Sequence, residues 1–204
     1  KMSMPMLAGV GLLVVCSSSS AAAMMMGGGE ETPAASTTTT PTTPVVKKYR
    51  YVRIAKTEDV ADWNQRYINL YEVYVNDDAG TNVALNKTVT GHETLNAHYA
   101  TWLPNLVDGD DTSLAHSGGG MHDATQPQKQ WLQIDLGVET DIKSVKIVDR
   151  AGYGGRLDKV KVILMKAATP STTDDVSTPA LTTADSAVGL IHSYDFTTKT
   201  WTHS

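Results

Sequence analysis

One short run of the chain gathers oxygen-bearing side chains around a glycine. Asn105, Asp108, Asp110 and Asp111 all fall in the stretch PNLVDGDDTSLAHSGGG, and Gly109 stands among them. One interpretation is a loop that wraps a cation, because hard cations take oxygen ligands and a glycine permits the sharp turn that points them inward. The alternative is an ordinary solvated turn, because Asp-Gly is also a common turn signal.

A second candidate lies further along the chain, where two arginines flank a glycine-rich turn. Arg150 and Arg156 bracket the segment AGYGG, and Tyr153 stands among its glycines. We expect this tyrosine to be exposed, which makes it a candidate contact for any partner. The alternative for Arg150 is a structural role at the end of a strand, paired with Asp149, Asp158 or a carboxylate of a loop.

Composition excludes several classes of function. The 204 residues carry a net charge of -5 and contain no basic block, so no nucleic-acid partner is expected. The single cysteine, Cys16, rules out a disulfide within the chain. The sequence has no G-x-S-x-G, no H-E-x-x-H and no phosphate-binding glycine loop, so we expect no enzymatic activity.

The chain divides into three regions. Residues 1–29 are an apolar head, uncharged from Met4 to Met26, which is about the length of a bilayer-spanning helix. Three interpretations of the head remain open: a membrane-anchor helix, a cleavable secretory signal, or an arm buried in a protein assembly. Residues 30–44 are rich in threonine and proline and predict an extended linker. Residues 45–204 predict the folded domain.

Short alternating runs bounded by turn residues fill the third region and predict an all-β fold, an antiparallel β-sandwich. A long surface loop is expected at residues 167–186, and a last pair of strands at residues 189–201. Trp102 and Trp131 stand in apolar runs and are expected in the core. The expected strands cover residues 49–55, 67–75, 82–90, 130–137, 142–150 and 157–165.

Five segments in this region resemble discoidin-like domains, also called coagulation-factor C-type domains, and most closely the F-type, fucose-binding lectins. They are NVALNKTVTGHE, NLVDGDDTS, WLQIDLG, IKSVKIVDR and RLDKVKVIL. The resemblance implies a galactose-binding-like jelly roll. One departure is informative, because YINLYEVYV, which resembles the strand that closes such a domain at its C-terminus, here precedes the other segments. We therefore expect one domain whose closing strand is supplied from the N-terminal side.

The resemblance also implies a structural calcium ion. Such domains hold it in a loop that resembles N-x-x-D-G-[ND], which places Asn105, Asp108 and Asp110 as ligands. The Ser117 hydroxyl is expected to add another oxygen. Glu72, in the displaced closing strand, matches the glutamate that completes the shell.

F-type lectins bind fucose through a histidine and two arginines, which the resemblance places at His122, Arg150 and Arg156. Three features depart from the family pattern R-x-D-x4-R: Gly152 stands where an aspartate is usual, the interval to the second arginine is one residue shorter, and the cysteine pair of this loop is missing. The alternative interpretation of His122, and of His116, is an exposed loop histidine.

The head resembles N-terminal anchors of structural proteins of large algal DNA viruses. This resemblance predicts a minor, capsid-associated virion protein tethered to an internal membrane, with capsid proteins and that membrane as partners. The alternative is a calcium-dependent lectin at a cell or virion surface that binds glycans. A secreted adhesion module is a further alternative and requires cleavage of the head.

Overall fold

The computed structural model describes residues 47–58, 62, 65–92, 97–118, 130–153, 155–171, 173–182 and 191–204. The folded domain is one compact unit, Pro44–Ser204. The predicted anchor helix of residues 1–29 and the linker of residues 30–44 lie outside the described residues. Among the described residues, no helix has the length and apolar character needed to cross a bilayer.

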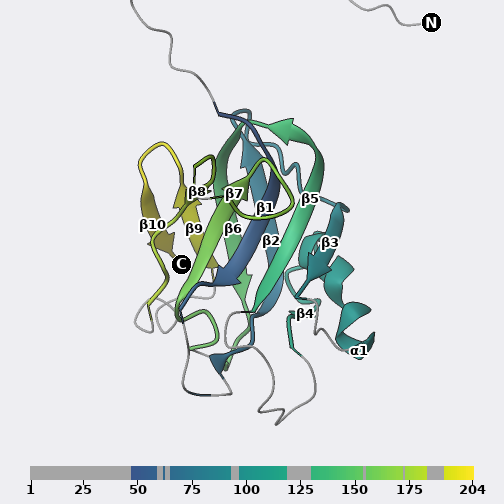
Figure 1. Cartoon of the computed structure of the whole chain (residues 1–204). Helices are drawn as coiled ribbons and strands as arrows, with labels where there is room; N and C mark the ends of the chain where they lie inside the picture. The colour runs from purple at the N-terminus through teal and green to yellow at the C-terminus, as the bar shows by residue number, and fades with distance from the viewer. Residues whose placement is uncertain are drawn as a thin grey trace, which may run out of the picture. The chain divides into compact units, whose positions relative to one another are not determined.

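The described residues form two antiparallel sheets, and Figure 1 shows β5, β1 and β7 of one in front of β2, β6 and β9 of the other. The first sheet has the order β3-β5-β1-β7-β8, with bounds Thr88–Gly91, Trp131–Thr140, Tyr49–Lys56, Val160–Met165 and Val176–Ser177. The second has the order β10-β9-β6-β2-β4, with bounds Thr200–His203, Ile191–Asp195, Ile142–Asp149, Asn69–Asp77 and Ala115–His116. Two short helices, α1 Ala97–Ala100 and η2 Leu103–Val107, lie between β3 and β4.

The core lies between the sheets because apolar side chains alternate along the strands. Val52 and Ile54 of β1 and Val73 and Val75 of β2 are fully buried, whereas Arg53 on the opposite face of β1 is partly exposed. The predicted antiparallel β-sandwich is therefore confirmed.

A β-bulge in β2 sets the direction of one functional side chain. The pairing of β2 with β6 shifts by one residue between Leu70 and Glu72. Leu70 and Val73 both lie in the core, although three positions separate them. The bulge therefore changes the alternation and turns Glu72, like Tyr74, toward the loop of residues 108–111, to which both side chains hydrogen-bond.

The expected strand at residues 82–90 is shorter in the structure and begins at Thr88. Residues 83–86 form a turn instead, and Asn86 has the left-handed φ of 57°. Asparagine tolerates this conformation better than most residues, which explains why an extended chain stops there. The expected surface loop of residues 167–186 contains the short strand β8.

The prediction that two tryptophans belong to the core is wrong. Trp102 and Trp131 are both partly exposed. The guanidinium of Arg53 lies 4.1 Å from the Trp131 ring centroid, and Trp102 packs edge-on against Tyr99. Tryptophan side chains are large and amphipathic, so an apolar run does not by itself place them inside.

Candidate functional site

Seven polar and aromatic side chains meet at one end of the second sheet. Asn69 begins β2 and pairs with His116, the last residue of β4, while Arg150 follows directly after β6. Strand pairing thus brings together segments that lie far apart in the sequence. We call the group the arginine cluster; its members are Tyr67, Asn69, Tyr99, His116, Arg150, Tyr153 and Arg156.

The two guanidinium groups of the cluster are held side by side. Arg150 lies 3.8 Å and Arg156 4.5 Å from the Tyr153 ring centroid. With its amide oxygen assigned toward the two arginine donors, the fully buried Asn69 accepts from Arg150 Nη1 at 3.0 Å and from Arg156 Nη1. Burial first, and then the charge of Arg150, lowers the pKa of Arg156.

Tyr153 is presented by a tight turn. Its backbone N–H donates to the Arg150 carbonyl at 3.4 Å, and its carbonyl accepts from Arg156 N at 3.2 Å. Gly152 has φ of 78°, a conformation that favours glycine, and so the turn carries glycine where the lectin pattern has aspartate. The Tyr153 side chain is 39% exposed, which agrees with the expectation of an exposed ring beside the arginines.

His116 belongs to the cluster, and the alternative that it is an exposed loop histidine is wrong. It is buried, stacks on Tyr99 with 4.4 Å between ring centroids, and accepts a 2.8 Å hydrogen bond from Gly118 N at Nδ1. Burial, followed by the charges of Arg156 and Arg150, lowers its pKa to about 4. The ring is therefore neutral near pH 7, and its proton sits on Nε2, 3.5 Å from Arg156 Nη1.

The predicted histidine of this site, His122, lies outside the described residues. The structure does bring Arg150, Tyr153 and Arg156 together as the prediction expected, and it adds His116. The signal that identifies His116 is the pairing of β4 with the start of β2. A strand of two residues has too little alternation for sequence reasoning to find it.

Two buried titratable groups lie next to the arginines. Asp149 is 2% exposed and accepts from Arg150 N at 2.7 Å, and burial raises its pKa to about 7, opposed by Arg156 and Lys56. Lys56 donates to the Asp158 carbonyl, and burial lowers its pKa to about 8. Sequence reasoning named Asp149 only as a pairing partner and did not find Lys56.

The loop after η2 forms the second candidate site, and Glu72 reaches it from β2. Glu72 is fully buried, and its Oε2 accepts from Gly109 N at 3.0 Å. Its Oε1 is buried without a hydrogen-bond partner among the described residues. Burial raises the pKa of Glu72 to about 8, and the neighbouring carboxyl of Asp108 adds to the effect.

Several oxygens of this loop converge on one hydroxyl, Ser113 Oγ. Asp108 Oδ2 lies 2.8 Å away, the Asp110 carbonyl 3.2 Å and the Asn105 carbonyl 3.4 Å. A hydroxyl has one proton and cannot donate to three acceptors. Convergent oxygens of this kind, beside a carboxylate oxygen that lacks a donor, fit a calcium ion.

The loop differs in detail from the predicted ligand set. Asp110 Oδ1 accepts from Thr112 N at 2.9 Å, and it is the Asp110 carbonyl that lies 3.2 Å from Ser113 Oγ. The Asn105 amide donates to Leu114 O at 3.1 Å, which leaves its carbonyl as the oxygen that points inward.

Ser117 lies elsewhere. Its hydroxyl accepts from Ile68 N at 2.8 Å and donates to Gln130, so it bridges the start of β2 to the start of β5. Ser113, which the sequence prediction did not include, is the serine that lies among the oxygens of the loop. Within the described chain, no group of three or more His, Cys, Asp or Glu side chains is placed to hold a metal. The candidate site depends on carbonyls and one hydroxyl beside Glu72 and Asp108.

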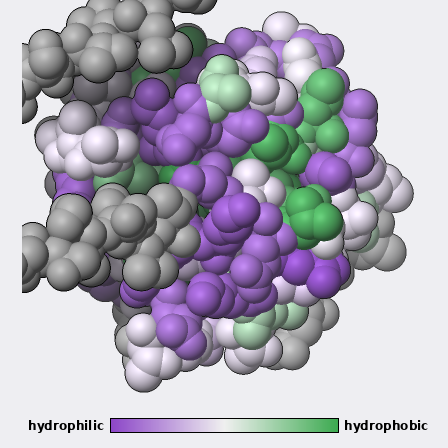
Figure 2. Space-filling model, turned by 90° about the horizontal axis from the view of Figure 1, so that it is seen from above, coloured by the Kyte–Doolittle hydropathy of each residue, from purple (hydrophilic) through white to green (hydrophobic). Residues whose placement is uncertain are grey.

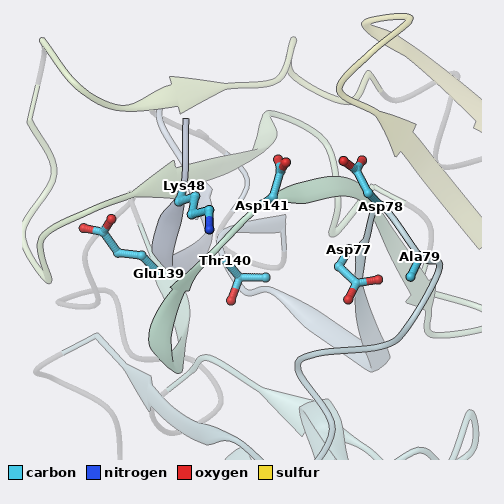
Figure 3. Close-up of a pocket in the computed structure, with 7 residues that line it drawn as sticks. All are labelled: Lys48, Asp77, Asp78, Ala79, Glu139, Thr140 and Asp141. Carbon is cyan, nitrogen blue, oxygen red and sulfur yellow. The ribbon is translucent and has the colours of Figure 1, made fainter. Parts of the chain in front are cut away.

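A surface hollow lies at the other end of the sandwich, where β2 and β5 end. Figure 2 looks onto this end and shows hydrophilic residues gathered in its middle. Figure 3 shows Asp78 and Asp141 pointing the same way; burial, followed by the charge of Asp78, raises the pKa of Asp141. None of the lining residues is buried, so the hollow is an acidic surface feature. It is lined by Lys48, Asp77, Asp78, Ala79, Glu139, Thr140 and Asp141.

Comparison with known proteins gives one match. Residues 105–201 match the F5/F8 type C family model described as a NedA-like, galactose-binding domain. No curated protein and no solved structure matches the chain. The matched segment contains the candidate calcium loop, His116 and both arginines of the cluster. It leaves out β1, β2 and β3, although β1 and β2 are interior strands of the two sheets.

Proposed function

We propose that the chain is a non-catalytic carbohydrate-binding module and that the arginine cluster is its saccharide site. The observation that carries this proposal is that hydrogen-bond donors of His116, Arg150 and Arg156 lie close together beside the exposed ring of Tyr153. This convergence lies within a segment similar to a galactose-binding domain. Saccharides present many acceptor oxygens together with less polar ring faces, and a few oriented donors beside an aromatic ring suit both features.

Calcium is the structural cofactor of this proposal. Glu72 Oε1, Asp108, Ser113 Oγ and the carbonyls of Asn105 and Asp110 would hold it. When bound, the ion supplies positive charge that offsets the buried carboxylates. The chain itself ties the loop to β2 through the Glu72–Gly109 hydrogen bond, and β2 also carries Asn69 of the arginine cluster. Calcium is therefore expected to stabilise the scaffold of the saccharide site, with no part in a reaction.

The predicted virion role remains an alternative that rests on the head and linker. No feature of the described residues favours it, so capsid partners, an internal membrane and a virion location stay predictions from residues 1–44. The two interpretations differ in partner: the virion role predicts contacts with capsid proteins and an internal membrane, whereas a lectin binds glycans at a cell or virion surface.

The test is calorimetric titration of the purified chain, in calcium, with a panel of methyl glycosides. Arg150→Gln and Arg156→Gln should each weaken binding about tenfold or more, because each removes a charged donor worth about 1.5–3 kcal/mol. Arg50→Gln is the matched control, since Arg50 pairs with Asp135 on the surface and lies outside the cluster. Binding by none of the glycosides, or equal losses in all three variants, would contradict the proposal.

A further inference from the structure

We propose that the arginine cluster selects an acidic saccharide, whose carboxylate accepts hydrogen bonds from His116 Nε2 and from the guanidinium groups of Arg150 and Arg156. This inference rests on the proposed function, because it names the class of sugar that the same site would take. Two observations carry it: the donors that face one another, and the balance of charge around them.

The first observation concerns His116 and Arg156. Gly118 N donates to His116 Nδ1, so the proton of the neutral ring is on Nε2. Arg156 Nη1, which is only a donor, lies 3.5 Å from that nitrogen. Two donors do not hydrogen-bond to each other, whereas an acceptor placed against both nitrogens can accept from each of them. A sugar hydroxyl brings its own proton into this space, whereas a carboxylate only accepts.

The second observation is that like charges are held together. The Asn69 amide oxygen and the Tyr153 ring bring both guanidinium groups to one place. The nearby buried carboxyl, Asp149, interacts with Lys56 as well as with Arg156. Burial raises its pKa to about 7, so only part of the Asp149 population is ionised at neutral pH.

An anionic ligand offsets the repulsion between the two arginines. The planar fork of a guanidinium also matches a carboxylate better than it matches a single hydroxyl. The exposed Tyr153 ring remains available to the body of the sugar. The charge and the donor geometry therefore favour the same ligand, a sugar acid.

The experiment compares three ligands that differ only at one carbon of the sugar: methyl galactoside, methyl galacturonide and the methyl ester of that galacturonide. We expect the acid to bind about tenfold tighter than the other two, because charge-assisted hydrogen bonds are about twice as strong as neutral ones. Arg150→Gln and Arg156→Gln should abolish this preference, and Arg50→Gln should keep it. Glucoside and glucuronide provide the same comparison in another configuration.

The outcomes separate the two proposals. Equal binding of acid, ester and neutral sugar would overturn the acidic preference and leave the saccharide site standing. Binding of no saccharide at millimolar concentration would overturn both. Sodium acetate and inorganic phosphate are included as competitors. If either one displaces the uronide at a concentration equal to that of the uronide, the cluster binds anions without recognising the sugar ring, and the inference is wrong.

Discussion

Glu72 is the buried carboxyl of the candidate calcium site. Its carboxyl group is fully buried, one oxygen accepts from Gly109 N, and the other has no donor among the described residues. Asp108 lies beside it and adds a second negative charge. Without a cation the stable arrangement is a protonated Glu72, which explains why its pKa is raised to about 8.

This raised pKa predicts how stability depends on pH in the metal-free protein. Between the unfolded value of 4.5 and the folded value of about 8, the folded state binds more protons, so the free energy of unfolding falls as pH rises through this window. Glu72→Gln keeps an acceptor for Gly109 N and cannot ionise. In EDTA at pH 8 we expect this variant to be more stable than the wild type by on the order of 2 kcal/mol.

Denaturant unfolding in EDTA at a series of pH values measures the difference. It should be small near pH 4 and grow toward pH 8. Asp149, whose pKa is raised to about 7, titrates in both proteins and cancels in the comparison. Parallel stability curves for the two proteins from pH 4 to pH 8 would show that Glu72 is not a buried acid.

How far individual site residues could be predicted depends on how far apart they lie in the sequence. Arg150, Tyr153 and Arg156 share one short turn, so their proximity follows from local sequence. Glu72 was placed near Asp108 only through the family resemblance, because no local pattern links residues so far apart. His116 was missed because its position depends on the pairing of β4 with β2.

At the scale of elements, the loop between η2 and β4 determines which serine lies near the other oxygens of the candidate calcium site. Ser113 Oγ meets three oxygens of the loop, whereas Ser117 Oγ bonds Ile68 N and Gln130. Sequence reasoning chose Ser117. Ser117 follows β4, which pairs with β2, so it lies beyond the loop. Nothing in the sequence shows that the loop ends before this residue.

This difference makes Ser113→Ala and Ser117→Ala a matched pair. Calcium at 100 times its dissociation constant stabilises a protein that binds it only when folded by about 2.7 kcal/mol. Ser113→Ala should lose most of the calcium-induced rise in melting temperature and change little in EDTA. Ser117→Ala should cost about 1–3 kcal/mol in either condition, because it leaves buried partners unsatisfied, while the calcium-induced rise stays the same.

Melting curves with and without calcium distinguish the two serines. A normal calcium response in Ser113→Ala together with a lost response in Ser117→Ala would restore the ligand set that the sequence predicted. No response to calcium in the wild type would remove the ion from the proposal altogether.

The strands themselves were more predictable than their irregularities. Alternation of apolar and polar residues predicted β1, β5, β6 and β7 near their observed bounds. It did not predict the bulge between Leu70 and Glu72, although that single shift decides which way Glu72 points. A bulge depends on the partner strand, and a partner strand is not visible in one segment of sequence.

At the scale of the whole molecule, the two sheets depend on strands from outside the matched segment. Residues 105–201 match the galactose-binding domain model, yet β1 lies between β5 and β7, and β2 lies between β6 and β4. The matched segment therefore lacks one interior strand of each sheet. The displaced order of motifs in the sequence indicated this arrangement, because the Glu72 strand is supplied from the N-terminal side.

This topology predicts where the chain can be cut. A fragment of residues 44–204 keeps both complete sheets and the whole buried core, so it should unfold within about 4 °C of the full chain, a shift that corresponds to about 1 kcal/mol. It should also bind the same saccharides. A fragment of residues 105–201 loses β1 and β2, and it should fail to give a cooperative transition because unpaired strands would flank the core.

The same pair of proteins tests the prediction for the head. If residues 1–29 are a membrane anchor, the full chain will float with phospholipid vesicles in a density gradient and the fragment of residues 44–204 will not, because about 20 uncharged residues supply the apolar length. Flotation of both would locate membrane affinity in the sandwich, and flotation of neither would contradict the anchor. Because saccharide binding is measured on the same two proteins, a failed anchor leaves the proposed binding module standing. If the full chain binds a sugar and the folded fragment does not, binding requires residues 1–43, and the sandwich alone is not the binding module.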